Sequence, residues 1–339
     1  MPPIPYWIRV CAMSEPPHSP QRLASPDEPV AQSRRLQPLA GPNWQAWERF
    51  KGNHGALFGG CFLILFLLVI ALWPFLSPYQ ANAISDLQFG APSWHHWFGT
   101  DVHGRDLFTR VAYGARISLL VGATGAAVSL AIGVLWGAVA GYAGGRWDSA
   151  LMRTVDILYA LPTIVFVIVV LTALNGLLEN WETHGLPGWA IQPLRMLGLF
   201  GGLGAVSWLT MARIVRGQVL SLRSRPFVEA SIALGATHTR VLLRSILPNL
   251  SGIIIVYLAL SVPGIVLYES FLSYLGMGIQ PPQASLGSLL AEGAEQINSV
   301  QVYWWVILFP AATLALTLLA LNFVGDGLRD ALDPRVRRQ

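Results

Sequence analysis

Six long apolar stretches run along the chain, each about long enough to cross a lipid bilayer. A helix rises 1.5 Å per residue, so about 20 apolar residues span ~30 Å of hydrocarbon. The stretches cover approximately residues 57–76, 117–142, 155–175, 194–212, 251–272 and 303–324. The fourth is the least apolar, because four glycines between positions 198 and 204 interrupt it. The pattern predicts six membrane-spanning helices.

The stretches must be helical, because lipid offers no hydrogen-bond partner to an unpaired backbone amide. A closed barrel would show alternating segments of about ten residues, whereas these stretches are continuous. Composition agrees: 53% of the 339 residues are hydrophobic and 12% are charged, against about 25% charged in globular proteins. The net charge of +4 provides no large basic surface for nucleic acid. We expect an all-α integral membrane protein, not a soluble enzyme, a disordered chain or a nucleic-acid binder.

The distribution of basic residues predicts the orientation. Eighteen of the 22 Lys and Arg residues fall in the N-terminal segment, the 143–154 loop, the 213–250 loop and the C-terminal segment. The other four are Arg105, Arg110, Arg116 and Arg195, which lie in the intervening loops. Because cytoplasmic loops carry the excess of Lys and Arg, both termini are expected in the cytoplasm.

These patterns divide the chain into four parts. The N-terminal part is rich in Pro, Ser and Gln and is expected to be largely disordered, up to an interfacial stretch near Trp44 and Trp47. The first apolar run of the chain begins near residue 57, which is too late for a cleavable signal peptide. The parts are a tail at 1–55, a first helix with an external loop at 56–116, a five-helix core at 117–325 and a cytoplasmic tail at 326–339.

The second apolar stretch carries Gly133, Gly137 and Gly141 at four-residue spacing. Because four residues complete slightly more than one helical turn, these glycines share one face and form a groove. A groove of this kind lets another helix approach closely within lipid. The approaching helix could belong to the same chain or to a second subunit.

The polar segment 213–250 is expected to fold outside the membrane as two short helices. Pro226 suits the first turn of a helix, and Glu229 falls near the positive end of that helix. The small residues Ala230, Ser231 and Ala233 leave one side of this helix without bulky side chains.

Gly235 then interrupts the first short helix so that the chain can turn. A second helical stretch at about 237–246 leads to Pro248, which opens the fifth span. Two short helices at an angle would form a projection that fits a groove on a partner.

This segment resembles the EAA loop of ATP-binding cassette importer permeases. The resemblance rests on Glu229-Ala230-Ser231, on Gly235 after three further residues, and on Leu247-Pro248. The chain departs from the family pattern at Ser231, where alanine is usual, and at Ser245, where isoleucine is usual. Both departures are mild, because serine is nearly as small as alanine and Ile246 lies beside Ser245.

Further motifs resemble the second, C-type permease subunit of dipeptide and oligopeptide importers over about residues 97–334. They are Phe98-Gly99-Thr100-Asp101, Gly104-Arg105-Asp106, Tyr113–Ser118, Asp156 with Leu161-Pro162, Phe271–Gly276 with Pro281-Pro282, and Gly325–Pro334. Ser207-Trp208, Gly217-Gln218 and Tyr268-Glu269-Ser270 resemble the oligopeptide member most.

The resemblance implies an importer-type permease fold in the bacterial inner membrane, with a coupling helix around Glu229. It implies a second homologous permease subunit, two ATP-binding subunits and a periplasmic or lipid-anchored peptide-binding protein as partners. ATP would be bound by those partners, and this chain would hold no cofactor. The cargo would be a peptide, and the resemblance favours an oligopeptide. Relatives with the same fold transport nickel complexes or glutathione, and these cargoes remain alternatives.

The sequence contains no constellation for catalysis. A phosphate-binding Walker A loop requires GxxxxGK[ST], and the only lysine, Lys51, lies between Phe50 and Gly52. His95, His96, His103 and Asp101 are the nearest approach to a metal-binding set, but neither Cys nor HxxxH spacing supports them. No metal site is expected, and the histidines are interpreted as part of an external loop.

Two acidic residues lie near or within apolar runs: Glu269 in the fifth and Asp156 at the edge of the third. Intramembrane charges favour a functional role by default. Glu269 either lines the translocation path or makes a structural hydrogen bond. Arg213 and Arg216 close the fourth span, where they anchor the boundary or contact the ATPase.

Two further classes of function remain to be distinguished. A secondary transporter or channel would need mid-span ionisable groups and inverted repeats, and neither is evident. A membrane anchor or signalling subunit would not co-purify with an ATPase and a homologous permease.

Overall fold

The computed structural model describes residues 42–184, 187–297 and 301–332. These residues belong to a single unit. The tail predicted at 1–55 lies outside the described residues up to position 41. Its interfacial stretch coincides with a helix, α1 (Pro42–Gly52), in which Trp47 stacks on Phe50.

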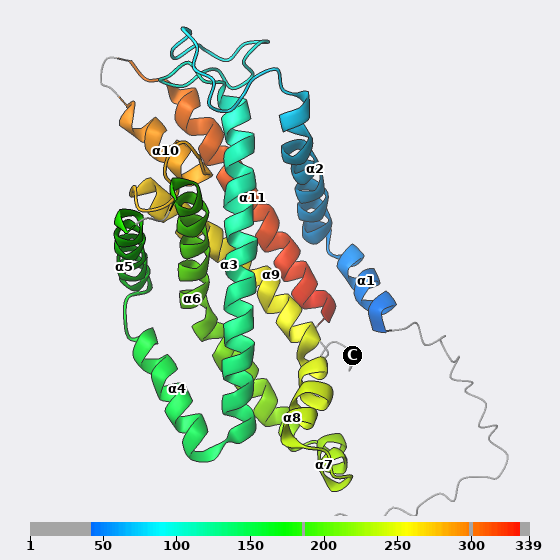
Figure 1. Ribbon diagram of the computed structural model, residues 1–339. Helices are drawn as coiled ribbons and strands as arrows, with labels where there is room; N and C mark the ends of the chain where they lie inside the picture. The colour runs from blue at the N-terminus through cyan, green and yellow to red at the C-terminus, as the bar shows by residue number, and fades with distance from the viewer. Residues whose placement is uncertain (1–41, 185–186, 298–300, 333–339) are drawn as a thin grey trace, which may run out of the picture. The chain divides into compact units, whose positions relative to one another are not determined.

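The described residues fold into helices joined by loops (Figure 1). After α1, the elements are α2 (His54–Leu76), α3 (Leu107–Ala143), α4 (Gly145–Tyr159), α5 (Thr163–Thr183), α6 (Gly188–Arg223), α7 (Pro226–Ala233), α8 (His238–Val241), the π-helical turn η2 (Leu242–Ile246), α9 (Leu247–Tyr274), α10 (Leu286–Glu295) and α11 (Trp304–Leu332). The all-α fold class is confirmed.

Six of the described helical stretches are long and apolar enough to cross a membrane, as predicted. They are His54–Leu76, Leu107–Ala143, Thr163–Trp181, Pro193–Arg223, His238–Tyr274 and Trp304–Leu332. The sixth continues to Leu332, beyond residue 324 where the apolar run ends. The second begins at Leu107, ten residues before the apolar run, because the Asp106 side chain caps it by accepting from Thr109 N.

The third span differs from its predicted bounds of 155–175. Residues 145–159 form a separate amphipathic helix, α4, and the span itself begins at Thr163. The helix is broken at Ala160–Pro162, because proline lacks the N–H of a continuing helix and disfavours helical backbone in the residue before it. Asp156 therefore belongs to α4 and not to the edge of a span.

Four apolar clusters hold the described helices together, and one of them packs Val155 of α4 against Leu209 of α6. Of the other three, one joins α3, α5, α6 and α9 around Leu203 and Ile265, and a second joins α2, α3, α9, α10 and α11 around Leu107 and Leu289. The third ties α7 and α8 to α3, α6 and α9.

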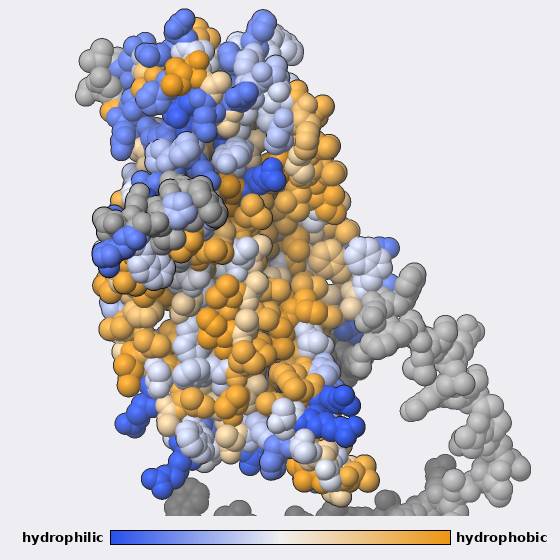
Figure 2. Space-filling model, viewed as in Figure 1, coloured by the Kyte–Doolittle hydropathy of each residue, from blue (hydrophilic) through white to orange (hydrophobic). Residues whose placement is uncertain are grey.

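The bundle has two distinct ends, which we call the α7 end and the α10 end after the short helices that they carry (Figure 1). The α7 end also carries α4 and α8, and the α10 end carries the loop that joins α2 to α3. A band of hydrophobic side chains covers the middle of the visible face, with hydrophilic side chains at both ends (Figure 2).

Candidate functional site

The α6–α9 connection forms the projection expected from the sequence, but it begins after Arg223 and not at residue 213, because α6 continues through residues 213–223. Arg225 precedes α7, and Pro226 occupies its first turn, where the missing N–H is no loss. The side chains of Glu229 and Ala230 are exposed. Val228 is fully buried and packs with Val241 of α8 and Ile246 of η2. This apolar contact fixes α7 to the rest of the bundle.

Gly235 lies where the chain turns between α7 and α8. Its φ of +82° is in the left-handed region, which glycine enters without steric cost. After α8 and η2, Pro248 lies in the first turn of α9. The two residues that depart from the family pattern meet here, since the hydroxyl oxygens of Ser231 and Ser245 are 3.4 Å apart.

Apolar side chains are exposed on the outer surface of α7 and at the residue that ends it, Leu234. Phe227, Ile232 and Leu234 are 43%, 46% and 88% exposed. In the space-filling view, hydrophobic side chains gather at this tip, beyond the hydrophilic side chains of the α7 end (Figure 2). Exposed apolar groups that cluster outside a membrane-spanning region are typical of a protein-binding surface. We call Phe227, Ile232 and Leu234 the α7 tip.

Two ion pairs connect α4 to α6 at the same end. Arg216 donates from Nε and Nη2 to the Asp148 carboxylate, at 2.7 Å each. Arg213 donates to Asp156 Oδ1 at 2.7 Å, and its guanidinium lies 3.9 Å from the centroid of the Tyr159 ring. Both arginines therefore bind carboxylates of this chain, a role that the sequence analysis did not foresee.

Glu269 is fully enclosed, with no exposed surface. Its carboxylate accepts from the hydroxyls of Ser118 at 2.8 Å and Ser273 at 2.7 Å. The Ser118 hydroxyl in turn accepts from Leu286 N at the start of α10, at 3.2 Å. The carboxylate thus links α3, α9 and α10 through hydroxyl groups. A position on the translocation path stays a prediction.

The three glycines of the second span receive α6 of the same chain. A Cβ at Gly133 would lie 2.9 Å from the Trp208 carbonyl oxygen, and one at Gly141 would lie 2.8 Å from that of Arg216. A Cβ at Gly137 would overlap the Ala212 carbonyl oxygen. Only glycine lets the two backbones approach this closely.

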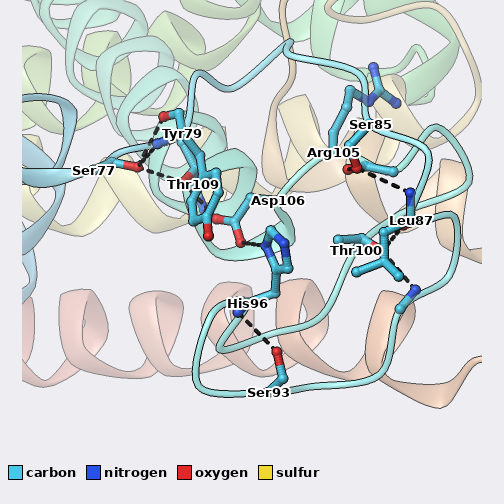
Figure 3. A network of polar contacts seen from close by, with 12 residues as sticks. Ser77, Tyr79, Ser85, Leu87, Ser93, His96, Thr100, Arg105, Asp106 and Thr109 are labelled. Carbon is cyan, nitrogen blue, oxygen red and sulfur yellow. Dashed lines mark hydrogen bonds and ion pairs between the residues drawn. The ribbon is translucent and has the colours of Figure 1, made fainter.

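The loop before α3 is held by side-chain hydrogen bonds (Figure 3). His96 Nδ1 and Asp106 Oδ1 are 2.9 Å apart, and Asp106 Oδ2 accepts from Thr109 N at 2.9 Å. The Thr100 hydroxyl donates to the Leu87 carbonyl oxygen at 2.5 Å. Among the residues that the structure describes, no three His, Cys, Asp or Glu side chains gather to hold a metal ion.

A charged cluster joins this loop to α3 and α10. Asp101 Oδ2 accepts from Arg105 Nε at 2.7 Å and from Arg110 Nη1 at 2.6 Å. Arg110 also binds both carboxylate oxygens of Glu292, at 2.5 and 3.0 Å. Burial alone would raise the pKa of Asp101, but the backbone N–H of Arg105 and the charges of Arg110 and Arg105 outweigh it and hold the pKa below its ordinary value.

The contribution of Glu292 to this cluster is not evident from the sequence. Asp101, Arg105 and Arg110 are close in the sequence, and their spacing could have suggested a local pair. Glu292 is separated from Arg110 by 182 residues, so no local pattern connects them.

The sequence matches two known families over different parts of the chain. Residues 133–338 match the family described as "Binding-protein-dependent transport system inner membrane component". Residues 41–92 match the "N-terminal TM domain of oligopeptide transport permease C".

Individual relatives are similar over most of the chain. The dipeptide transport system permease protein DppC of Bacillus subtilis is 45% identical, over 86% of this chain and 86% of that protein. The oligopeptide transport system permease protein OppC of Escherichia coli K12 is 43% identical, over 90% of this chain and 95% of that protein. The OppC protein of Haemophilus influenzae is 41% identical, over 87% and 89%.

Proposed function

The chain belongs to the family of inner membrane components of binding-protein-dependent transport systems, and from this premise we propose that it is a permease subunit of an ATP-driven peptide importer. The proposal includes a second homologous permease subunit and two ATP-binding subunits. A periplasmic or lipid-anchored binding protein would deliver the peptide. The described helices supply the membrane-spanning part of this assembly.

The observation that carries the proposal is the apolar α7 tip on a projection outside the spans. Exposed apolar side chains that gather in this way are typical of a surface that a partner covers. We assign the ATP-binding subunit as that partner, with Glu229, Ala230, Ser231 and Gly235 in the docking segment. Pro248 would begin the span that receives its motion.

This assignment sets the orientation. The α7 end would face the cytoplasm, together with both termini, which agrees with the excess of basic residues in the same segments. The α10 end would then face the binding protein. ATP hydrolysis is assigned to the partner subunits, since the single lysine, Lys51, is not part of a phosphate-binding loop.

The peptide cargo is supported by the relatives, whose names include both dipeptide and oligopeptide permeases at nearly equal identity. Closure of the ATP-binding subunits would push on α7 and transmit the movement through the apolar contacts of Val228 to α6 and α9. The spans would thereby change between inward- and outward-open arrangements.

The test separates ATP hydrolysis from uptake in proteoliposomes that contain the complete transporter. We expect Gly235→Arg to lower peptide uptake at least about tenfold while ATP hydrolysis continues, because an L-residue at this φ strains the turn and redirects α7. Gly252→Ala is the matched control, since it lies in regular α9 with no atom near an added Cβ. Normal uptake by Gly235→Arg would contradict the proposal. Co-purification of the four subunits shows that the variant has assembled.

A further inference from the structure

A polar cavity of about 200 Å³ lies at the α10 end, between α5, α6 and the segment that follows α9. In Figure 1, α5 and α6 run side by side toward the α10 end. Leu171, Leu174, Met196 and Leu199 supply apolar lining. The polar lining consists of Asn175, Glu179, Arg195, Gln280 and Gln283.

The one acidic and the one basic side chain of this cavity are unpaired among the described residues, unlike the charged cluster around Arg110. Neither Glu179 nor Arg195 makes a hydrogen bond or ion pair with any described residue. The Nε atom of Arg195 is buried and has no acceptor. A buried guanidinium nitrogen without an acceptor is costly, so the site is suited to a ligand that brings an anion.

The remaining polar groups are carboxamides, which both donate and accept hydrogen bonds. Gln280 donates from its side-chain nitrogen to the Gly276 carbonyl oxygen at 2.7 Å, which fixes the amide at the cavity wall. Asn175 and Gln283 complete the set. Carboxamides match the amide groups of a peptide backbone without selecting for its side chains.

We propose that this cavity binds a short peptide by its free termini, with Glu179 against the terminal ammonium and Arg195 against the terminal carboxylate. The inference rests on the peptide import proposed above and adds a recognition site to it. Peptides of different sequence share only their backbone amides and their two charged ends. A cavity with one carboxylate, one guanidinium and three carboxamides complements those shared groups. The flat fork of Arg195 suits a carboxylate in particular.

The test compares three peptides: tri-alanine, N-acetyl-tri-alanine and tri-alanine amide. ATP-dependent uptake by the complete transporter is measured as kcat/KM in proteoliposomes, for the wild type and for Glu179→Gln, Arg195→Gln and Glu295→Gln. Each variant is compared with the wild type for the same peptide, so any selectivity of the binding protein cancels. Glu295 is the matched control, because it is exposed on α10 and does not line the cavity.

We expect Glu179→Gln to lower uptake of tri-alanine and of its amide about tenfold, the loss of one charge-assisted hydrogen bond, and to leave the N-acetyl peptide unchanged. Arg195→Gln should lower uptake of tri-alanine and the N-acetyl peptide about tenfold and leave the amide unchanged. Glu295→Gln should change none of the three. Equilibrium dialysis of the same peptides with the transporter lacking its binding protein should show the same pattern at millimolar concentration, whichever peptides the binding protein accepts.

Equal effects on all three peptides, or none, would overturn the site while leaving peptide import in place. That result is also expected if a zwitterionic lipid head group, and not cargo, occupies the cavity. A wild-type transporter that imports no peptide would overturn the proposed function and this inference with it.

Discussion

Individual charged residues connect parts of this protein that are distant in sequence. Asp101, Arg110 and Glu292 join the loop before α3 to α10, and Arg110 is only 2% exposed. Removing one member of such a buried set leaves the other charges without compensation. The α10 end therefore depends on the ionisation of Asp101.

The first prediction concerns the pH dependence of stability. Because the pKa of Asp101 lies below its ordinary value of about 3.9, its stabilising contribution is fully present above that pH and is lost as pH falls through the folded-state pKa. We expect Asp101→Asn to lower the free energy of unfolding by about 3 kcal/mol at pH 7. The difference from the wild type should shrink as pH falls below about 3.9.

Unfolding of the purified chain by SDS titration at several pH values measures this difference. Asp86→Asn serves as the control, because Asp86 lies in the same loop with an exposed side chain. A constant difference between wild type and Asp101→Asn from pH 7 to pH 3 would show that the carboxylate charge is not responsible.

At the scale of elements, the closest packing is between α3 and α6, where Gly133, Gly137 and Gly141 face α6 backbone. Four-residue spacing was sufficient to predict the groove, because it follows from helix periodicity alone. It did not identify the helix that fills it. That choice depends on which helices the loops and the remaining side chains bring together.

The second prediction tests this contact. Gly137→Ala should destabilise the chain by about 1–3 kcal/mol, because the added methyl group overlaps the Ala212 carbonyl oxygen and a backbone must shift. Gly217→Ala, on α6, has no atom within 4 Å of the added Cβ and should be neutral or stabilising. Thermal unfolding in detergent measures both. Equal stability of the two variants would argue against a tight α3–α6 contact.

At the scale of the whole molecule, the orientation follows from one assumption, that the α7 tip docks on a cytoplasmic partner. The distribution of basic residues independently supports the same orientation. One measurement of the orientation therefore tests both arguments. Positions are needed that are exposed at opposite ends and lie outside the α7 tip. Arg146 in α4 and Trp94 in the loop before α3 fulfil this requirement.

The third prediction concerns labelling of these positions by a membrane-impermeant maleimide. Each cysteine is introduced into a variant whose two native cysteines are removed by Cys11→Ser and Cys61→Ser. Trp94→Cys should react in spheroplasts, and Arg146→Cys should react only in inverted vesicles. Residue 94 is 95% exposed in the wild-type chain, so poor accessibility would not explain a negative result. The reverse pattern would overturn the orientation and the assignment of α7 to the ATP-binding partner.

The sequence by itself determined the number of the spans, their helical type, and the turn at Gly235. These features depend on local quantities, namely the length of an apolar run and the backbone preferences of proline and glycine. The break at Pro162 was also encoded locally, but the apolar residues on both sides concealed it.

Only the tertiary structure decided that α6 fills the glycine groove, that Glu269 is enclosed by hydroxyl groups, and that Glu292 pairs with Arg110. It also placed Glu179 and Arg195 on one cavity. These pairings join residues on different helices, and a helix pattern fixes which face is apolar but not which neighbour meets it.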